Sequence, residues 1–490
     1  MRRILSLVLG LGALMAVTGE GRAAATADEA AKLKAAFESW LPSGVPLTPA
    51  EGEYLVSNLS AVQPIGAWTV EPEGTGYRIE SPGIRGVLFR AIEPITGRIL
   101  LTCDPDRMRA EPVAAGRYAL SGDEPLSCRL EQAGGGTWRI VARQRRTTGS
   151  VDLNAPVALT MEVALDQVTI QRDGDPAPLR IDRLTLSGGS NATPDGRSDL
   201  TSRITLEGLS GPSPSGTGMV RADSLAYDVG IQGGDMVGMT NAAVALAKHF
   251  AGREGSTGSG DDPAVQALQD AYLRGTGTGS HMAVTLDGIV AATPSVTLKA
   301  GTLAFGMGVG DVSREASTMI VRLDGKGLAV EPRSAYSDWT PVEGTVQLSV
   351  DDMPLRSILT QMMRPGAGET ADPQRLIEAR TSIRFNTVRL MAPQAGLDLG
   401  GQITMNPDAR LQQTGTLQLR LTGIDGLVKA LQADPQASQA AAGLSILQVL
   451  GRQTALPDGR SARDYDIVID PSGKVLVNGA DVQALVPKPL

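Results

Sequence analysis

The sequence predicts a mainly β protein with interspersed helices, an α+β chain whose amphipathic antiparallel strands form extended, curved sheets. Glycine contributes 58 of the 490 residues and aromatic residues only 3%, which is typical of many short strands with aliphatic cores. Apolar and polar residues alternate with period two in many segments, whereas helical periodicity is confined to short stretches. The chain is long for one compact core, so several units or one elongated unit are expected.

Residues 1–25 have the pattern of a secretory signal peptide. Two arginines precede an apolar run of fourteen residues, and small residues follow it. A membrane anchor is the alternative, but a spanning helix needs about 20 apolar residues. We therefore expect cleavage after Ala23 or Ala25 and a mature protein in the periplasm.

Residues 26–150 predict an N-terminal helix followed by a β-rich region of short strands. Asp28 is the candidate N-cap of the helix. Cys103 and Cys128 are the only cysteines of the chain, and an even number in a secreted protein predicts a disulfide. The bond would close a loop of about 25 residues and stabilise the fold by roughly 3 kcal/mol. A redox pair is the less favoured alternative because C-x-x-C spacing is missing.

Residues 151–250 predict amphipathic strands and a helix. The clearest strand carries apolar side chains on alternate positions, at Leu159, Met161, Val163 and Leu165. Polar residues fill the positions between them, so one face of this strand is expected to be dry and the other wet.

Residues 251–262 are rich in glycine, serine and aspartate and predict a flexible loop between two helical segments, 242–250 and 263–273. The loop marks either a boundary between an N-terminal and a C-terminal portion or a helical hairpin inserted between strands.

Residues 263–490 predict a strand–helix region with a partial repeat. Residues 344–348 (GTVQL) and 415–419 (GTLQL) begin similar strands, each leading into a helix, at an offset of 71 residues. The apolar residues of these strands that share a face are Val346, Leu348, Leu417, Leu419 and Leu421. Such units bury their apolar faces by stacking on a neighbour. The segment 438–450 predicts an apolar helix, interpreted as a core helix, with a membrane-surface helix as the alternative.

Motifs for catalysis or metal binding are missing from the sequence. His249 and His281 are the only histidines, and neither has metal-ligand spacing or a nucleophile-elbow motif nearby. The acidic pairs are expected to be solvated turn or helix-cap residues; they are Asp351 and Asp352, Asp261 and Asp262, and Asp104 and Asp106. We therefore expect a non-enzymatic protein without cofactor or metal, with a hydrolase as a distant alternative.

Charge narrows the possible partners. The net charge of −8 disfavours nucleic acid. Residues 143–146 (RQRR) form the clearest basic cluster, interpreted as a solvated strand end, with anionic lipid headgroups as the alternative contact.

The C-terminal residues carry a family resemblance. Residues 464–470 (DYDIVID) form a predicted strand, Ser472 and Gly473 a turn, residues 474–478 a returning strand, and residues 485–490 (LVPKPL) the end of the chain. This pattern and the preceding strand–helix units resemble a proteobacterial family known as domain of unknown function 2125. The resemblance covers mainly residues after about 290 and implies an envelope location and no established activity. The architecture is more distantly similar to AsmA-like envelope proteins, whose folded-sheet grooves are associated with lipid movement.

Two functional hypotheses follow. In the first, the dry strand faces line an apolar groove for lipid or another amphiphile, with Leu159, Met161, Val163, Leu165, Val346, Leu348, Leu417, Leu419 and Leu421 as its candidate lining. In the second, the same faces pack together as core, and the protein is an envelope scaffold that acts through protein contacts. Partners are accordingly lipid or a membrane surface in the first case and envelope proteins in the second.

Overall fold

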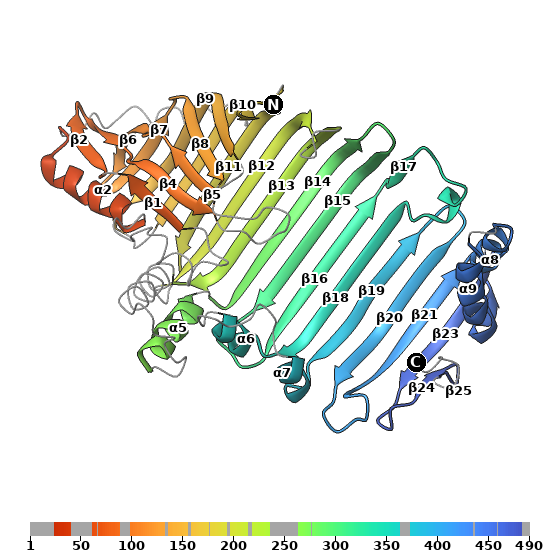
Figure 1. The fold of residues 1–490 in the computed structure, drawn as a ribbon. Helices are drawn as coiled ribbons and strands as arrows, with labels where there is room; N and C mark the ends of the chain where they lie inside the picture. The colour runs from red at the N-terminus through yellow and green to blue at the C-terminus, as the bar shows by residue number, and fades with distance from the viewer. Residues whose placement is uncertain are drawn as a thin grey trace, which may run out of the picture.

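The computed structural model describes residues 24–40, 61–65, 67–88, 99–132, 136–154, 158–175, 177–193, 197–213, 218–235, 263–275, 277–362, 373–434, 437–457 and 459–482. Within these residues, 25 strands belong to one antiparallel sheet (Figure 1). The predicted mainly β class is confirmed, although the strands form one sheet and not several. Nearly all of the predicted signal peptide, the loop 251–262 and His249 lie outside the described residues.

The N-terminal part of the sheet contains nine strands. They are β1 (Ala61–Ile65), β2 (Thr69–Glu73), β3 (Gly76–Glu80), β4 (Gly83–Leu88), β5 (Ile99–Cys103), β6 (Arg107–Ala114), β7 (Arg117–Gly122), β8 (Leu126–Gln132) and β9 (Gly136–Asp152). The long strand β9 pairs with β7 along one half and with β8 along the other. The sheet therefore divides into two branches at β9, one through β7, β6, β3 and β2 and the other through β8, β5, β4 and β1.

The second branch contains the predicted disulfide. Cys103 of β5 lies directly opposite Cys128 of β8 in the antiparallel register, with 4.0 Å between their Cα atoms. The two sulfurs are bonded, which confirms the prediction. The bond joins two neighbouring strands of one branch to each other.

The remaining strands extend the sheet from β9. They are β10 (Ala158–Arg172), β11 (Leu179–Ala192), β12 (Ser198–Pro212), β13 (Met219–Gly234), β14 (Gly279–Ala292), β15 (Thr297–Gly310), β16 (Ser317–Lys326), β17 (Ala329–Glu331), β18 (Glu343–Met353), β19 (Ser382–Met391), β20 (Gly396–Met405), β21 (Gln413–Thr422), β22 (Arg452–Ala455), β23 (Ser461–Ile469), β24 (Val475–Val477) and β25 (Ala480–Asp481). β13 pairs directly with β14, so the sheet is continuous across the chain segment that includes residues 251–262.

A line of irregular residues crosses the sheet from β10 to β14. At this line the apolar side chains step by three residues, from Leu165 to Val168 on β10 and from Leu206 to Leu209 on β12, and both members of each pair join one apolar cluster. Gln167, Gly208 and Gly288 have positive φ values of 53°, 67° and 60° at these positions. A Cβ on Gly208 would lie 2.1 Å from a carboxylate oxygen of Asp182, so a substitution there would displace Asp182 and would also strain the backbone, because other residues rarely adopt this φ. Irregularities of this kind bend strands, and repeating them at one level curves the sheet.

The described helices are short. They are α2 (Ala27–Trp40), α5 (Pro263–Gly275), η1 (Ser337–Trp339), α6 (Leu355–Met362), α7 (Pro373–Glu378), α8 (Ile424–Gln432) and α9 (Ser438–Leu450). The backbone N–H of Glu29 donates a hydrogen bond to Oγ1 of Thr26 at 3.3 Å. Thr26 therefore caps α2, and the prediction of Asp28 as N-cap is wrong because Asp28 lies in the first helical turn.

Helix α2 packs on the first branch of the sheet, and the two together enclose an apolar core. Leu33 and Phe37 are buried together with Tyr77, Ile79 and Val151. The ring of Phe37 stacks on Trp68 with 4.9 Å between centroids. This cluster gives the N-terminal end of the sheet a closed apolar core.

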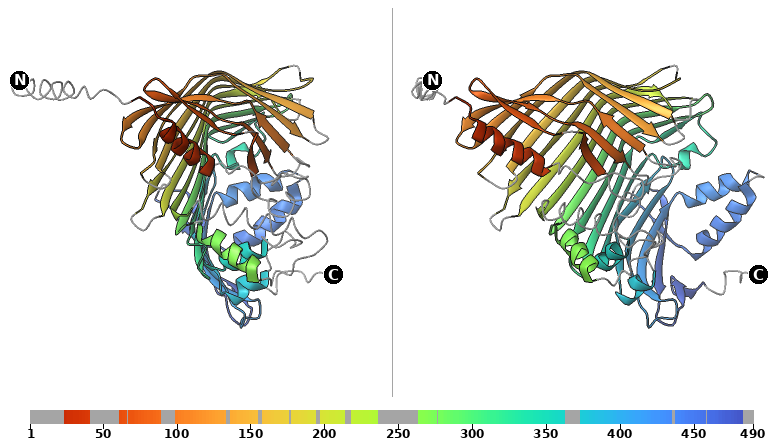
Figure 2. Two further views of the ribbon diagram at one scale, coloured as in Figure 1. Left: turned by 90° about the vertical axis from the view of Figure 1, so that its left-hand side faces the viewer. Right: turned by 60° about the vertical axis from the view of Figure 1, so that its left-hand side comes forward.

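The other helices lie at the rims and at the far end of the sheet. Figure 2 shows α5 and the α8–α9 pair on the same side of the curved sheet. Leu273 of α5 and Leu355 of α6 pack with Val309 of β15. The strands of the predicted repeat, β18 and β21, run in opposite directions because β19 and β20 separate them. Helices α6 and α8, which follow these strands, therefore lie at opposite rims (Figure 1).

Candidate functional site

The sheet has one apolar face, built from three rows of side chains. Each row crosses the eleven strands from β10 to β21, leaving out β17, and consists of residues that are direct partners in the register. Because side chains on a strand alternate between faces, these rows share one face. We call this surface the apolar face.

The three rows contain almost exclusively aliphatic residues, phenylalanine and glycine. The first row is Leu165, Leu184, Leu206, Leu225, Leu286, Leu303, Gly325, Gly344, Leu390, Leu397 and Leu421. The second row is Val163, Leu186, Ile204, Tyr227, Val284, Phe305, Leu323, Val346, Val388, Leu399 and Leu419. The third row is Met161, Gly188, Ser202, Val229, Met282, Met307, Val321, Leu348, Phe385, Gly401 and Leu417. None of these positions carries a charge.

The apolar face is only partly covered. Leu165 is 3% exposed and belongs to a buried cluster near the N-terminal branches. Leu186 is 37% exposed and Leu323, in the middle of the sheet, is 50% exposed. Most other members of the rows are half-buried. Large contiguous apolar surfaces are uncommon on soluble proteins unless they bind something.

The structure brings most of the predicted lining residues onto this face. Met161, Val163 and Leu165 lie on β10, Val346 and Leu348 on β18, and Leu417, Leu419 and Leu421 on β21, all within the three rows. The backbone of Leu159 pairs with Val151, but its side chain lies outside the described residues. The sequence prediction did not assign the central strands β14 to β16 to the lining, although their alternation is the same signal.

An ion pair bounds the apolar face at its N-terminal end. Arg145 of β9 lies opposite Leu165 in the register and pairs with Asp106, and the two side chains are 13% and 9% exposed. Nε of Arg145 also donates to Oγ1 of Thr147 at 3.2 Å. Burial raises the pKa of Asp106, although the nearby Arg145 guanidinium acts in the opposite direction. The interpretation of residues 143–146 as a solvated strand end is therefore wrong for Arg145, while Arg143 and Arg146 are exposed.

A second polar cluster bounds the face at its C-terminal end and fixes the α8–α9 pair to β23. Arg463 of β23 pairs with Asp425 of α8 at 3.1 Å and donates to the carbonyl oxygen of Gln448 in α9 at 2.7 Å. The hydroxyl of Tyr465 donates to the carbonyl oxygen of Leu447 at 2.8 Å. Charged and hydrogen-bonded groups thus occupy both ends, and the apolar rows lie between them.

Helix α9 agrees with its predicted bounds but is only partly a core helix. Ala441 is buried, whereas Ile446 is 53% and Val449 is 83% exposed. The interpretation of α9 as an ordinary core helix is therefore wrong for the side that carries Ile446 and Val449.

The opposite, polar face carries a ladder of paired charges across β18 to β23. Arg389 pairs with Asp398 at 2.6 Å, and Arg420 pairs with Asp464 at 2.7 Å. Hydrogen bonds from Arg420 hold the pKa of Asp464 below its ordinary value, and the same contact raises the pKa of Arg420. The groups of this ladder satisfy one another across strands, which is a structural role.

The ladder predicts a specific acid sensitivity. Because the pKa of Asp464 is lowered on folding, its stabilising contribution is complete above the ordinary value of about 3.8 and is lost as pH falls through the folded-state value. In Arg420→Met, the thermal unfolding temperature should depend less steeply on pH below about 3.8. At neutral pH, the variant should lose at most about 1 kcal/mol of unfolding free energy. Superimposable acid profiles of the variant and the wild type would contradict the assignment.

The other candidate groups are structural or lie outside the described residues. Asp351 pairs with Arg384 at 3.5 Å, and the carbonyl oxygen of Asp352 accepts a hydrogen bond from Thr381. Asp261 and Asp262 are not among the described residues. Within the described chain, no group of three or more His, Cys, Asp or Glu side chains is placed to hold a metal ion. His281 lies on the polar face, where it is the register partner of Gly230 and Gly308.

Comparison with known proteins identifies a family for the C-terminal part of the chain. Residues 245–484 match a family described as an uncharacterised protein conserved in bacteria, DUF2125. This part of the chain belongs to the DUF2125 family. The DUF2125 region begins before β14 and includes every later strand together with the α8–α9 pair, so it provides seven of the eleven strands of the apolar face.

The other comparisons add no relative. No curated protein and no solved structure matches the chain. The more distant similarity to AsmA-like proteins is accordingly not supported by any comparison. Among the described helices, none is both long and apolar enough to cross a membrane.

Proposed function

We propose that the protein binds lipid, or another amphiphile with long apolar chains, on the apolar face of its sheet and serves as a lipid-binding or lipid-transfer protein of the bacterial envelope. The observation that supports this most directly is the run of three uncharged rows across eleven strands. Burying such a surface under acyl chains yields about 25 cal/mol per Å² of apolar area.

The dimensions of the apolar face suit acyl chains. Neighbouring strands are about 4.8 Å apart, so ten intervals between β10 and β21 span roughly 48 Å. This exceeds the hydrocarbon thickness of a bilayer, about 30 Å. The face can therefore hold several chains in succession, and a lipid can move along it without meeting a charged side chain.

The proposed location in the periplasm rests on two features. Residues 1–25 have the pattern of a secretory signal peptide. The Cys103–Cys128 disulfide is compatible with an oxidising compartment.

Native mass spectrometry with lipid extraction tests the proposal directly. The full chain, purified from the periplasm of a Gram-negative host in a detergent exchanged for a volatile buffer, is expected to carry lipid, with more than one molecule per protein at saturation. Vesicles of phosphatidylethanolamine and phosphatidylglycerol provide added lipid for protein that is purified empty. Protein that is empty after purification and remains empty after incubation with these vesicles would overturn the proposal.

A scaffold function is the second candidate, and helix α9 supports it. Ile446, Leu447 and Val449 are exposed apolar side chains on a helix without charged residues. Such a surface is typical of a protein contact. The same purification distinguishes the two functions, because a scaffold is expected to be free of lipid and to retain a protein partner through α9.

A further inference from the structure

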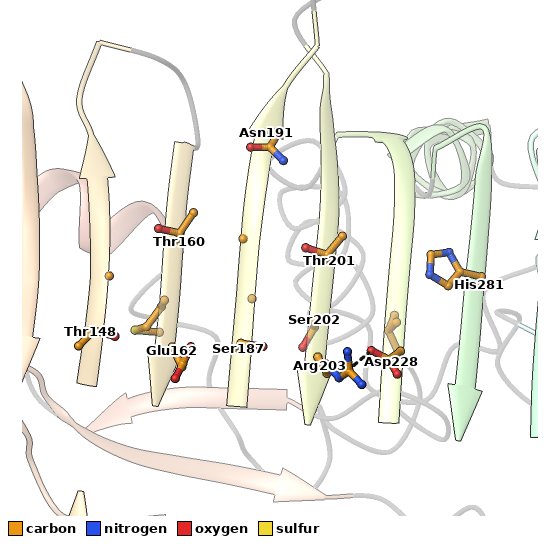
Figure 3. Close-up of a pocket in the computed structure, with 15 residues that line it drawn as sticks. Thr148, Thr160, Glu162, Ser187, Asn191, Thr201, Ser202, Arg203, Asp228 and His281 are labelled. Carbon is orange, nitrogen blue, oxygen red and sulfur yellow. Dashed lines mark ion pairs between the residues drawn. The ribbon is translucent and has the colours of Figure 1, made fainter. Parts of the chain in front are cut away.

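The polar face has a hollow that lies away from the charge ladder. It lies over β9 to β14 and has a volume of about 590 Å³, within the usual range of ligand sites (Figure 3). Thr148, Glu162, Ser187, Arg203 and Asp228 form one row across five neighbouring strands on this face. The hollow is on the face opposite the proposed lipid contact, so it does not depend on that proposal.

Two glycines create the depth of this hollow. In the next row, Thr160, Gly189, Thr201, Gly230 and His281 are partners in the register, so two of five positions have no side chain. A Cβ on Gly230 would lie 2.1 Å from Cε1 of His281. The glycine therefore allows the imidazole ring to lie over β13 and form one wall of the hollow (Figure 3).

Several polar groups of this hollow have no partner, in contrast to those of the ladder, although Thr160 shares a hydrogen bond with Ser150 at 2.8 Å. In the described structure, the side chains of Glu162, Thr201 and His281 make no hydrogen bond or ion pair, and Arg203 pairs only with Asp228, at 3.4 Å. A hollow of similar size over β19 to β23, about 580 Å³, is lined by Arg389, Asp398, Arg420 and Asp464, which bond to one another. Hydrogen-bonding groups held on a rigid sheet but not used by it are available to a ligand.

The mixture of groups defines the chemical class of that ligand. Glu162 and Asp228 accept hydrogen bonds, Arg203 donates them, and Ser187 and Thr201 do both. Arg203 is paired with Asp228, so the unpaired Glu162 gives the three charged groups a net negative charge, which disfavours a phosphate. Among the described residues, no group of three or more His, Cys, Asp or Glu side chains is placed to hold a metal ion. A neutral ligand with many hydroxyl groups can donate to and accept from all of them. We propose that this hollow is a binding site for a neutral oligosaccharide, which lies across β9 to β14.

Isothermal titration calorimetry of the full chain with two probes, cellotetraose and the tetrasaccharide of N-acetylglucosamine, tests this site. The wild type is expected to bind at least one of them. Glu162→Gln and Thr201→Val each remove one hydrogen-bonding group and should raise Kd roughly tenfold for the probe that binds. Gly230→Val, which displaces His281 and fills the hollow, should abolish binding.

Thr205→Val is the matched control for Thr201→Val. Thr205 lies on the same strand and the same face but does not line the hollow, so Kd should be unchanged. Thermal unfolding curves show whether each variant is folded. Glu162→Gln is nearly isosteric at an exposed position, so it tests the site even if Gly230→Val does not fold. Absence of binding of both probes at millimolar concentrations, or equal Kd values in the wild type, Glu162→Gln and Thr201→Val, would overturn the proposal.

Discussion

Replacing Leu323 by aspartate is expected to remove bound lipid from the apolar face while the sheet remains folded. Leu323 lies in the middle row on β16, between Phe305 and Val346, and half of its side chain is exposed. A carboxylate at this position is hydrated in the empty protein but would be buried without a partner under an acyl chain, which is costly. Native mass spectrometry should show lipid occupancy reduced at least about tenfold.

Ile320→Asp provides a matched control. Ile320 lies on the same strand, is 45% exposed, and is placed between Gly308 and Ser349 on the polar face. The two variants introduce the same charge at similar exposure, so they differ only in the face that they alter. Equal lipid occupancy in both variants would contradict lipid binding on the apolar face. Leu165 is unsuitable for this test because, at 3% exposure, its replacement by aspartate would destabilise the fold itself.

The sequence was sufficient to predict which residues of a single strand share a face. Alternation is a local property, and Met161, Val163 and Leu165 lie on the apolar face in the order that their spacing indicates. The opposition of Cys103 and Cys128 was also predictable, because these are the only cysteines in the chain. Strand register between distant segments was not predictable, and it is the register that joins the local patterns into three rows.

The line of irregular residues explains why period-two alternation assigns only part of each long strand to the correct face. On β10 the apolar side chains step from Leu165 to Val168, and Gln167, with a φ of 53°, occupies the irregular position. A three-residue step interrupts period two, so alternation alone assigns the residues beyond it to the wrong face. Gly208 beside Asp182 is a possible sequence signal for such a position, but glycine is too frequent in this chain to single it out.

The polar hollow was missed for a related reason. Thr201, Gly230 and His281 lie far apart in the sequence, and none of them belongs to a recognisable motif. Their arrangement depends on the pairing of β12 with β13 and of β13 with β14. A site made from single residues of several strands leaves no motif in the sequence.

Replacing Asp106 by alanine is expected to destabilise the protein by about 3 kcal/mol, because it leaves the guanidinium of Arg145 nearly buried without its carboxylate. Arg145 would retain only its hydrogen bond to Thr147. The double variant Asp106→Leu with Arg145→Met removes both charges and should recover most of this loss, since apolar replacements of a buried ion pair are commonly neutral. Urea unfolding of the three proteins measures both effects.

The pH dependence of the same proteins has a predictable sign. Burial raises the pKa of Asp106, so the pH-dependent part of its contribution to stability is complete below the ordinary value of about 3.8 and is lost as pH rises through the folded-state value, while its pair with Arg145 remains. This is opposite to Asp464, whose contribution is lost as pH falls. In the wild type, the unfolding free energy should therefore decrease as pH rises above about 3.8. This decrease should be absent from both variants that lack Asp106. A single variant as stable as the wild type would mean that Arg145 is solvated, and that the N-terminal end of the apolar face is open to water.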